Sequence, residues 1–149
     1  MLFEGITKLN IAIAAEIHAV SWRESHRAFC SEAFVEAHTT ERQMQYIENE
    51  IKNGKQFYVL IDKDAKGIVS IKDSLIENLY VLPSEQRKGY GTKLLHFAEQ
   101  KCLATPTLWI LSNNEAAKNL YRKNGYVFTG NTKPPKNELQ ELEMQLVAQ

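Results

Sequence analysis

The clearest chemical signal in this sequence is the run Gln-Arg-Lys-Gly-Tyr-Gly at positions 86–91, between an apolar segment ended by a proline and a segment with helical spacing of apolar residues. The first backbone N–H groups of a helix have no partner inside it and carry partial positive charge, so they bind anions. Gly89 and Gly91 lack a Cβ and let the backbone approach a phosphate closely. Arg87 and Lys88 add formal positive charge. The sequence therefore predicts a site for a phosphate-bearing cofactor.

A second group of residues that could do chemistry lies at positions 21–30. It mixes the rings of Trp22, His26 and Phe29 with charged side chains, among them Glu24. Two interpretations are open. In one, a helix end packs one aromatic side chain into the core while its charges stay in water. In the other, Trp22 and its neighbours form the wall of a substrate cleft.

The strands around the glycine loop predict a mixed sheet. Phe57–Ile61 and Ile68–Ile71 are rich in β-branched and aromatic residues and are joined by a polar turn, which indicates a hairpin that Leu75–Leu82 continues. The helix after the loop has one apolar face, formed by Leu94, Leu95, Ala98 and Cys102. Thr107–Leu111 is a further strand, and a strand–helix–strand order requires parallel pairing with a right-handed crossover.

Helices are predicted before these strands. Asn10 can cap a helix that runs to about Ser21. Residues Ser31–Asn53 have a helical pattern with a break near His38–Thr40, where Thr40 followed by Gln43 fits a capping box.

The C-terminal part is predicted to return the chain to the sheet. Asn114 caps a second amphipathic helix that Gly125 ends. Tyr126–Thr129 is a strand and Asn131–Asn137, which contains two prolines, is a loop. The last strand alternates apolar and polar residues, with Leu142, Met144 and Leu146 on the apolar side. One α+β domain over residues 1–149 accounts for the whole pattern.

Composition narrows the classes of function. Apolar content of 44% and charged content of 24% are ordinary for a globular protein, and a formal net charge of zero does not favour a nucleic-acid partner. Cys30 and Cys102 are too few for a disulfide scaffold, and no His or Cys cluster has metal-ligand spacing. The apolar run Ile11–Val20 is interrupted by Glu16 and His18 and is not a membrane span. We expect a cytoplasmic protein without a metal or a membrane partner.

Two common phosphate-binding motifs do not fit the loop. A P-loop requires GxxxxGK[ST], which is absent. A dinucleotide fingerprint requires GxGxxG, but Leu94 stands where the third glycine is needed. The glycine loop therefore belongs to another kind of site.

The loop resembles motif A of the GNAT N-acetyltransferase superfamily, Q/R-x-x-G-x-G/A, which residues 86–91 match. The strand and proline before it, at positions 78–83, are also similar to the family's approach to this motif, although Leu82 stands where many relatives carry His or Asp. Downstream, the family pattern N-x-x-A-x-x-L-Y-x-x-x-G-F/Y is matched by Asn114, Ala117, Leu120, Tyr121, Gly125 and Tyr126. Two motifs at the family's separation are far more specific than either alone, and the resemblance covers nearly the whole chain.

The resemblance implies a GNAT-like α+β fold with a mixed, mostly antiparallel sheet of about six to seven strands and about four helices. It also implies acetyl-CoA as cosubstrate, with the pyrophosphate on Arg87–Thr92 and the pantetheine arm on the backbone of a strand that splays from its neighbour. The implied cofactor-binding residues are Leu79, Val81, Gln86, Arg87, Lys88, Gly89, Tyr90, Gly91, Thr92, Asn114 and Tyr121.

Acetyl transfer to an amine leaves two proton transfers to assign. Tyr121 matches the family's general acid, which protonates the leaving thiolate; otherwise it is a core tyrosine. Glu77 is the candidate base for the amine, since simple strand alternation places it on one face with Leu79 and Val81. The alternative for Glu77 is a salt bridge or a solvent-facing position.

We therefore expect an acetyl-CoA-dependent N-acetyltransferase that acts on a primary amine of a small molecule or peptide by direct attack in a ternary complex. The alternative is a non-catalytic acyl-CoA sensor with the same fold. The acceptor site is expected between Ile17 and His38 and at the loop Asn131–Asn137. An aromatic wall with one carboxylate, suited to a cationic amine, would come from Trp22, Glu24, His26 and Phe29. The last strand offers a possible homodimer contact.

Overall fold

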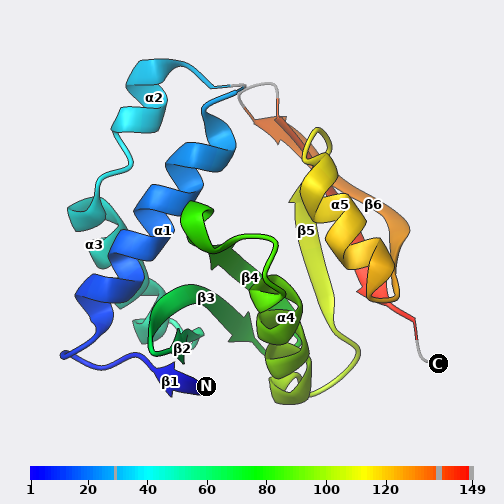
Figure 1. Cartoon of the computed structure of the whole chain (residues 1–149). Coiled ribbons are helices and arrows are strands. Elements are labelled where there is room, and N and C mark those ends of the chain that lie inside the picture. Colours follow the sequence, from blue (N-terminus) through cyan, green and yellow to red (C-terminus); the bar gives the residue numbers. More distant parts are fainter. Residues whose placement is uncertain (29, 137–138, 148–149) are drawn as a thin grey trace.

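Three consecutive helices follow the first strand, and strands with two further helices make up the rest of the chain (Figure 1). The computed structural model describes residues 1–28, 30–136 and 139–147. Its elements are β1 (Leu2–Gly5), α1 (Ile11–His26), α2 (Glu32–Glu36), α3 (Thr40–Lys52), β2 (Gln56–Asp62), β3 (Asp64–Lys72), β4 (Leu75–Val81), a 3₁₀ turn (Pro83–Glu85), α4 (Tyr90–Lys101), β5 (Thr107–Leu111), α5 (Glu115–Lys123), β6 (Tyr126–Lys136) and β7 (Leu139–Leu146).

The strands form one mixed sheet in the order β1-β2-β3-β4-β5-β7-β6. All described neighbours pair antiparallel except β4 and β5, which are parallel and connected by α4. The predicted α+β class and mostly antiparallel sheet are confirmed, and so is the parallel pair around the glycine loop.

Helices cover both faces of the sheet, and each face has its own core. On one face, Leu94 and Leu95 of α4 and Tyr121 of α5 pack against Val69 and Ile76. On the other, Ile17 of α1 and Ile47 of α3 pack with sheet residues such as Val59 and Ile68. Burying one such side chain stabilises the fold by about 1.5–3 kcal/mol. The helices of the second face are held close to β4 as a result.

Three predicted details are wrong at the ends of elements. α1 continues to His26, beyond the expected end near Ser21. Asn10 occupies the N-cap position of α1 as predicted, but its side-chain oxygen accepts from Thr7 N at 2.8 Å and caps no N–H group of the helix. The N-cap of α3 is Thr39, whose hydroxyl accepts from Arg42 N at 3.2 Å, because the helix begins one residue earlier than the capping box implied.

Strand β6 also differs from its prediction. It extends to Lys136 through the described part of the segment expected to be a loop, Asn131–Asn137, with two shifts in its register against β7. Asn137 lies outside the described residues. Prolines are tolerated in β6 because it is an edge strand.

Among the helices of the described ranges, none is long and apolar enough to cross a membrane.

Candidate active site

The predicted glycine loop turns the chain from β4 into α4. Gly89 has φ +87° and Arg87 has φ +65°, a region that glycine adopts without steric cost and other residues only with strain. A Cβ on Gly89 would meet no atom within 4 Å, so the space beside it is open. Within the described ranges, no backbone N–H group of residues 86–92 donates a hydrogen bond. These free donors at the start of α4 form an anion-binding surface.

Two side chains of the loop anchor it to the sheet. Gln86 Nε2 donates to the carbonyl of Val81 at 3.2 Å, and the Tyr90 hydroxyl donates to Asp62 at 2.8 Å. The first of these bonds ties the loop to the end of β4. The loop's backbone is thereby held in place while its N–H groups stay exposed.

The charges of the loop have different surroundings. Lys88 Nζ lies 2.9 Å from a Glu85 carboxylate oxygen, and this contact lowers the pKa of Glu85. The same carboxylate lies 3.5 Å from Lys66 Nζ. Arg87 makes no ion pair with the described residues, so its guanidinium is available to a bound anion.

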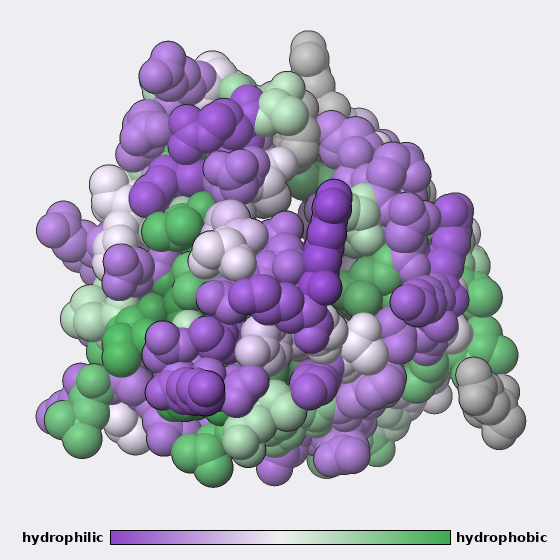
Figure 2. Space-filling view, viewed as in Figure 1, coloured by the Kyte–Doolittle hydropathy of each residue, from purple (hydrophilic) through white to green (hydrophobic). Residues whose placement is uncertain are grey.

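Next to the loop, β4 and β5 separate. Their parallel pairing is confined to Leu75 and Thr107, and Figure 1 shows the two strands fanning apart beyond this point. Figure 2 shows a hollow on the same side of the molecule, bordered largely by hydrophilic residues. Leu79 and Val81 lie on the separated part of β4, with side chains against the α4–α5 core. The strand edge toward β5 is open to an extended ligand that pairs with its backbone.

Tyr121 lies on α5 with only 8% of its surface exposed. Its helix starts where predicted, since Asn114 Oδ1 accepts from Ala117 N at 3.1 Å. Burial raises the pKa of Tyr121 to about 12. The phenol is therefore protonated at neutral pH and can donate a proton.

Glu77 does not share a face with Leu79, contrary to the prediction from simple alternation. The pairing of β4 with β3 shifts register here, and Asn78 has φ +51°. A bulge adds one residue and reverses the alternation beyond it. The Glu77 carboxylate lies on the α1–α3 face instead, 2.9 Å from Lys55 Nζ.

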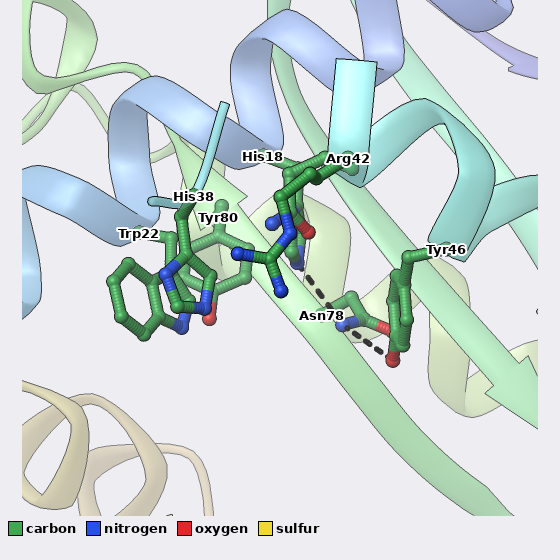
Figure 3. Close-up of a pocket in the computed structure, with 8 residues that line it drawn as sticks. His18, Trp22, His38, Arg42, Tyr46, Asn78 and Tyr80 are labelled. Carbon is green, nitrogen blue, oxygen red and sulfur yellow. Dashed lines mark hydrogen bonds between the residues drawn. The ribbon is translucent and has the colours of Figure 1, made fainter. Parts of the chain in front are cut away.

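A cavity of about 350 Å³ opens on this face between α1, α3 and β4 (Figure 3). Its lining residues are His18, Trp22, His38, Arg42, Gln43, Tyr46, Asn78 and Tyr80. Two of them, Asn78 and Tyr80, belong to β4, so the cavity adjoins the strand that separates from β5. Its volume lies in the range of small-molecule sites.

Trp22 is the member of the predicted aromatic cluster that lines the cavity. Its ring is stacked between those of His38 and His26, with centroid distances of 3.5 Å and 3.9 Å. Glu24 is exposed and is not part of the cavity wall, so the expected carboxylate is not supplied there. Phe29 lies outside the described residues.

A comparison with protein-family models identifies the family that has this arrangement of glycine loop, separated strands and buried tyrosine. A family model described as an acetyltransferase (GNAT) domain matches residues 53–128, which include the loop, the separated strands and Tyr121. The chain belongs to the GNAT acetyltransferase family. No curated protein matches it.

Solved GNAT structures share the fold over nearly the full chain. A PaiA N-acetyltransferase from Thermoplasma acidophilum, solved with coenzyme A, is 19% identical over 96% of this chain and 98% of its own, with a TM-score of 0.68. YncA, a putative acetyltransferase from Salmonella typhimurium with acetyl-CoA, is 22% identical over 98% and 92%, with a TM-score of 0.70. The SpeG spermidine N-acetyltransferase from Vibrio cholerae is 17% identical over 99% and 95%, with a TM-score of 0.69.

Sequence reasoning missed Lys55, the centre of a buried polar network behind the GNAT site. Besides Glu77, its Nζ lies 3.3 Å from Glu50 Oε1 and from the Tyr46 hydroxyl, and 3.4 Å from Asn78 Oδ1. Burial lowers the pKa of Lys55, but Glu77 and Tyr46 together raise it more, so the ammonium stays charged. A lysine just before a strand gives no sequence signal of this role. The sequence feature that could have indicated a buried polar network is the pair of polar residues Glu77 and Asn78 within an otherwise apolar strand.

Proposed function

We propose that this GNAT domain transfers the acetyl group of acetyl-CoA to a primary amine by direct attack in a ternary complex. The observation that carries the proposal is the separation of β4 from β5 beside the glycine loop. An extended cosubstrate with a phosphate group would be held there along its length. Structures with this fold have been solved with coenzyme A and acetyl-CoA.

The residues present fit coenzyme A. Its pyrophosphate would accept from the free N–H groups of residues 87–92, with Arg87 adding charge. The backbone of Leu79 and Val81 would pair with the pantetheine arm as an added strand. Acetyl-CoA supplies an activated acetyl thioester, and the protein holds the thioester and the amine in position to react. Orientation of two reactants can contribute about 7–11 kcal/mol to lowering the barrier.

Tyr121 is the proposed proton donor to the leaving sulfur. As the amine nitrogen bonds the acetyl carbon, the carbon–sulfur bond breaks and the sulfur takes the phenolic proton. The Tyr121 phenol is protonated at neutral pH, so its proton is available when the sulfur leaves. The neutral amine loses one further proton as it becomes an amide, and this proton restores the Tyr121 phenol, so an amine and a thioester become an amide and a thiol with the enzyme unchanged.

Glu77 is the proposed acceptor of the amine's proton, acting through water. An alkylamine with a pKa near about 10 must lose a proton before it attacks. Glu77 lies on the cavity face and is adjacent in sequence to Asn78, which lines the cavity. Its ion pair with Lys55 favours a second candidate function, a CoA-binding module without catalysis, because a carboxylate bound to a buried lysine is less free to accept a proton.

A thiol-release assay separates the two candidates. Acetyl-CoA and the protein are mixed with polyamines, aminoglycosides, amino acids and peptides with free N-termini, and CoA binding is measured in parallel by titration calorimetry. Turnover of one amine class supports acetyl transfer. CoA binding with no turnover across the panel supports the binding module, and an absence of CoA binding contradicts both.

A further inference from the structure

The cavity between α1, α3 and β4 has one permanent formal charge. Among its described lining residues, Arg42 is the cation and none is a carboxylate. Burial lowers the pKa of His18 to about 4, against a smaller opposing effect of Gln43, so this ring is neutral at physiological pH. Two acidic side chains of this face, Glu50 and Glu77, lie outside the lining and both contact Lys55, which balances one of their two charges. The charge in the lining itself is therefore the positive charge of Arg42.

The Arg42 guanidinium is held in position but keeps donors for a ligand. Its Nη1 donates to the carbonyl of Ala37 at 3.0 Å, which anchors one edge of the group. Figure 3 shows the guanidinium between the stacked rings of Trp22 and His38 on one side and Tyr46 on the other. The remaining N–H groups form the planar fork that binds a carboxylate through two parallel hydrogen bonds.

His18, which lines the same cavity, has a buried ring nitrogen that an additional oxygen could bind. It is 4% exposed, and no described atom completes a hydrogen bond to its Nδ1, although the Gln43 amide lies near enough to favour the protonated ring. Asn78 Oδ1 accepts from Ser70 at 2.7 Å and from Lys55, so the amide nitrogen of Asn78 faces His18 Nε2 at 3.4 Å. A neutral ring that accepts at Nε2 carries its proton at Nδ1. No described atom meets hydrogen-bond geometry to that buried N–H, and a shift of the Gln43 amide, an oxygen of the ligand or a bridging water would supply its acceptor.

We propose that the acceptor is a small amine that also carries a carboxylate, such as an amino acid, and that its carboxylate binds Arg42. This inference rests on the proposed acetyl transfer. A polyamine would instead bring further positive charge beside Arg42, which is unfavourable. The Trp22 ring, stacked against His38, provides a flat wall for the rest of the acceptor.

Tyr80 links this cavity to the transfer site. It lines the cavity from β4, and burial raises its pKa, with smaller contributions from the nearby phenols of Tyr121 and Tyr46. The cavity wall therefore includes β4, the strand that separates from β5 beside the glycine loop. An acceptor bound at Arg42 would lie on the α1–α3 side of this strand.

The test compares amino acids with their carboxamides, which keep the amine and remove the negative charge. In the thiol-release assay, the wild type should prefer the acids, and Arg42→Gln should lose about 10–100-fold in kcat/KM for them, mainly through KM, while its activity on amides changes little. Arg42→Lys should retain part of the preference. The matched control is Arg27→Gln, an exposed arginine 3.6 Å from Glu36 and outside the cavity, which should behave as the wild type.

Calorimetric titration of the same amino acids into the CoA-saturated protein separates this inference from acetyl transfer. Arg42-dependent binding without turnover would uphold the inference and contradict acetyl transfer. Turnover of spermidine or of the amides at least equal to that of the acids, unchanged in Arg42→Gln, would overturn the inference while acetyl transfer stands. Failure of every amino acid both to bind and to react would also overturn it.

Discussion

Burial reinforces the protonation states that the side chains around this site have at neutral pH. It raises the pKa of Tyr121, which stays protonated, and lowers that of His18, which stays neutral, while Lys55 remains charged because Glu77 and Tyr46 offset its burial. The protonation states of Tyr121, His18 and Lys55 are therefore defined before any ligand binds. Arg42 is left as the charge that a ligand meets.

The buried His18 should make the protein less stable in mild acid. Its pKa is 6.5 in the unfolded chain and about 4 in the fold, so between these values the unfolded state binds a proton that the folded state does not. The free energy of unfolding should fall as the pH falls through this window, by about 3 kcal/mol in all. Thermal melts from pH 7 to 4 should show this loss, and His18→Gln should lack it.

The matched control for that experiment is His96→Gln, because His96 is exposed on α4. Its melting temperature should keep the pH dependence of the wild type. An equal pH dependence in His18→Gln would show that acid sensitivity arises elsewhere.

At the scale of elements, the loop and the strand before it could be predicted, but the bulge in β4 could not. The glycines and helical spacing around residues 86–91 define the turn into α4 because only local geometry is involved. The position of Glu77 depends on one left-handed residue, Asn78, which is held by Ser70 of β3 and by Lys55, just before β2. Such tertiary hydrogen bonds leave no local pattern, so alternation placed Glu77 on the wrong face.

Replacing Gly89 should lower the affinity for CoA, an effect beyond the loss of folding stability that the strained backbone causes. Gly89→Ala forces a side chain into φ +87° at a cost of about 1–2 kcal/mol, and its Cβ would stand where the phosphate approaches. Gly130→Ala imposes similar strain at φ +95° on β6, also with no atom within 4 Å. Both variants should lose similar thermal stability, but calorimetry should show lower CoA affinity for Gly89→Ala alone. Equal CoA affinity in the two would argue against pyrophosphate binding at this loop.

At the scale of the whole molecule, the candidate site is assembled from segments far apart in the chain. Periodicity predicted the helices and strands, and paired motifs predicted the GNAT fold. The cavity was only partly foreseen: Trp22 was singled out, whereas Arg42 and His18 were not, because each is an ordinary helix residue until α1 and α3 pack beside β4. Charge complementarity across elements is a property of the tertiary structure.

The packing of α4 on the sheet should depend on Gly67. A Cβ there would lie 2.6 Å from the Tyr80 carbonyl oxygen and 2.8 Å from Leu94 Cδ1, so β4 or α4 would have to move. Gly67→Ala should destabilise the fold by about 2–3 kcal/mol, or roughly 6–10 °C in Tm. Gly5→Ala on edge strand β1, whose Cβ would meet Tyr58 at 4.0 Å, should change Tm little. A Gly67→Ala variant as stable as Gly5→Ala would contradict this packing.

The central claim, acetyl transfer at the opening between β4 and β5, is tested most directly by comparing Tyr121→Phe with the wild type. Thiol release should fall by about 10²–10⁴ in kcat, while CoA affinity measured by calorimetry stays unchanged. Tyr58→Phe is the control, since its hydroxyl bonds the exposed Gln56. A Tyr121→Phe variant with the kcat of the wild type would contradict the account. So would a variant whose loss of thiol release is fully explained by a loss of CoA affinity.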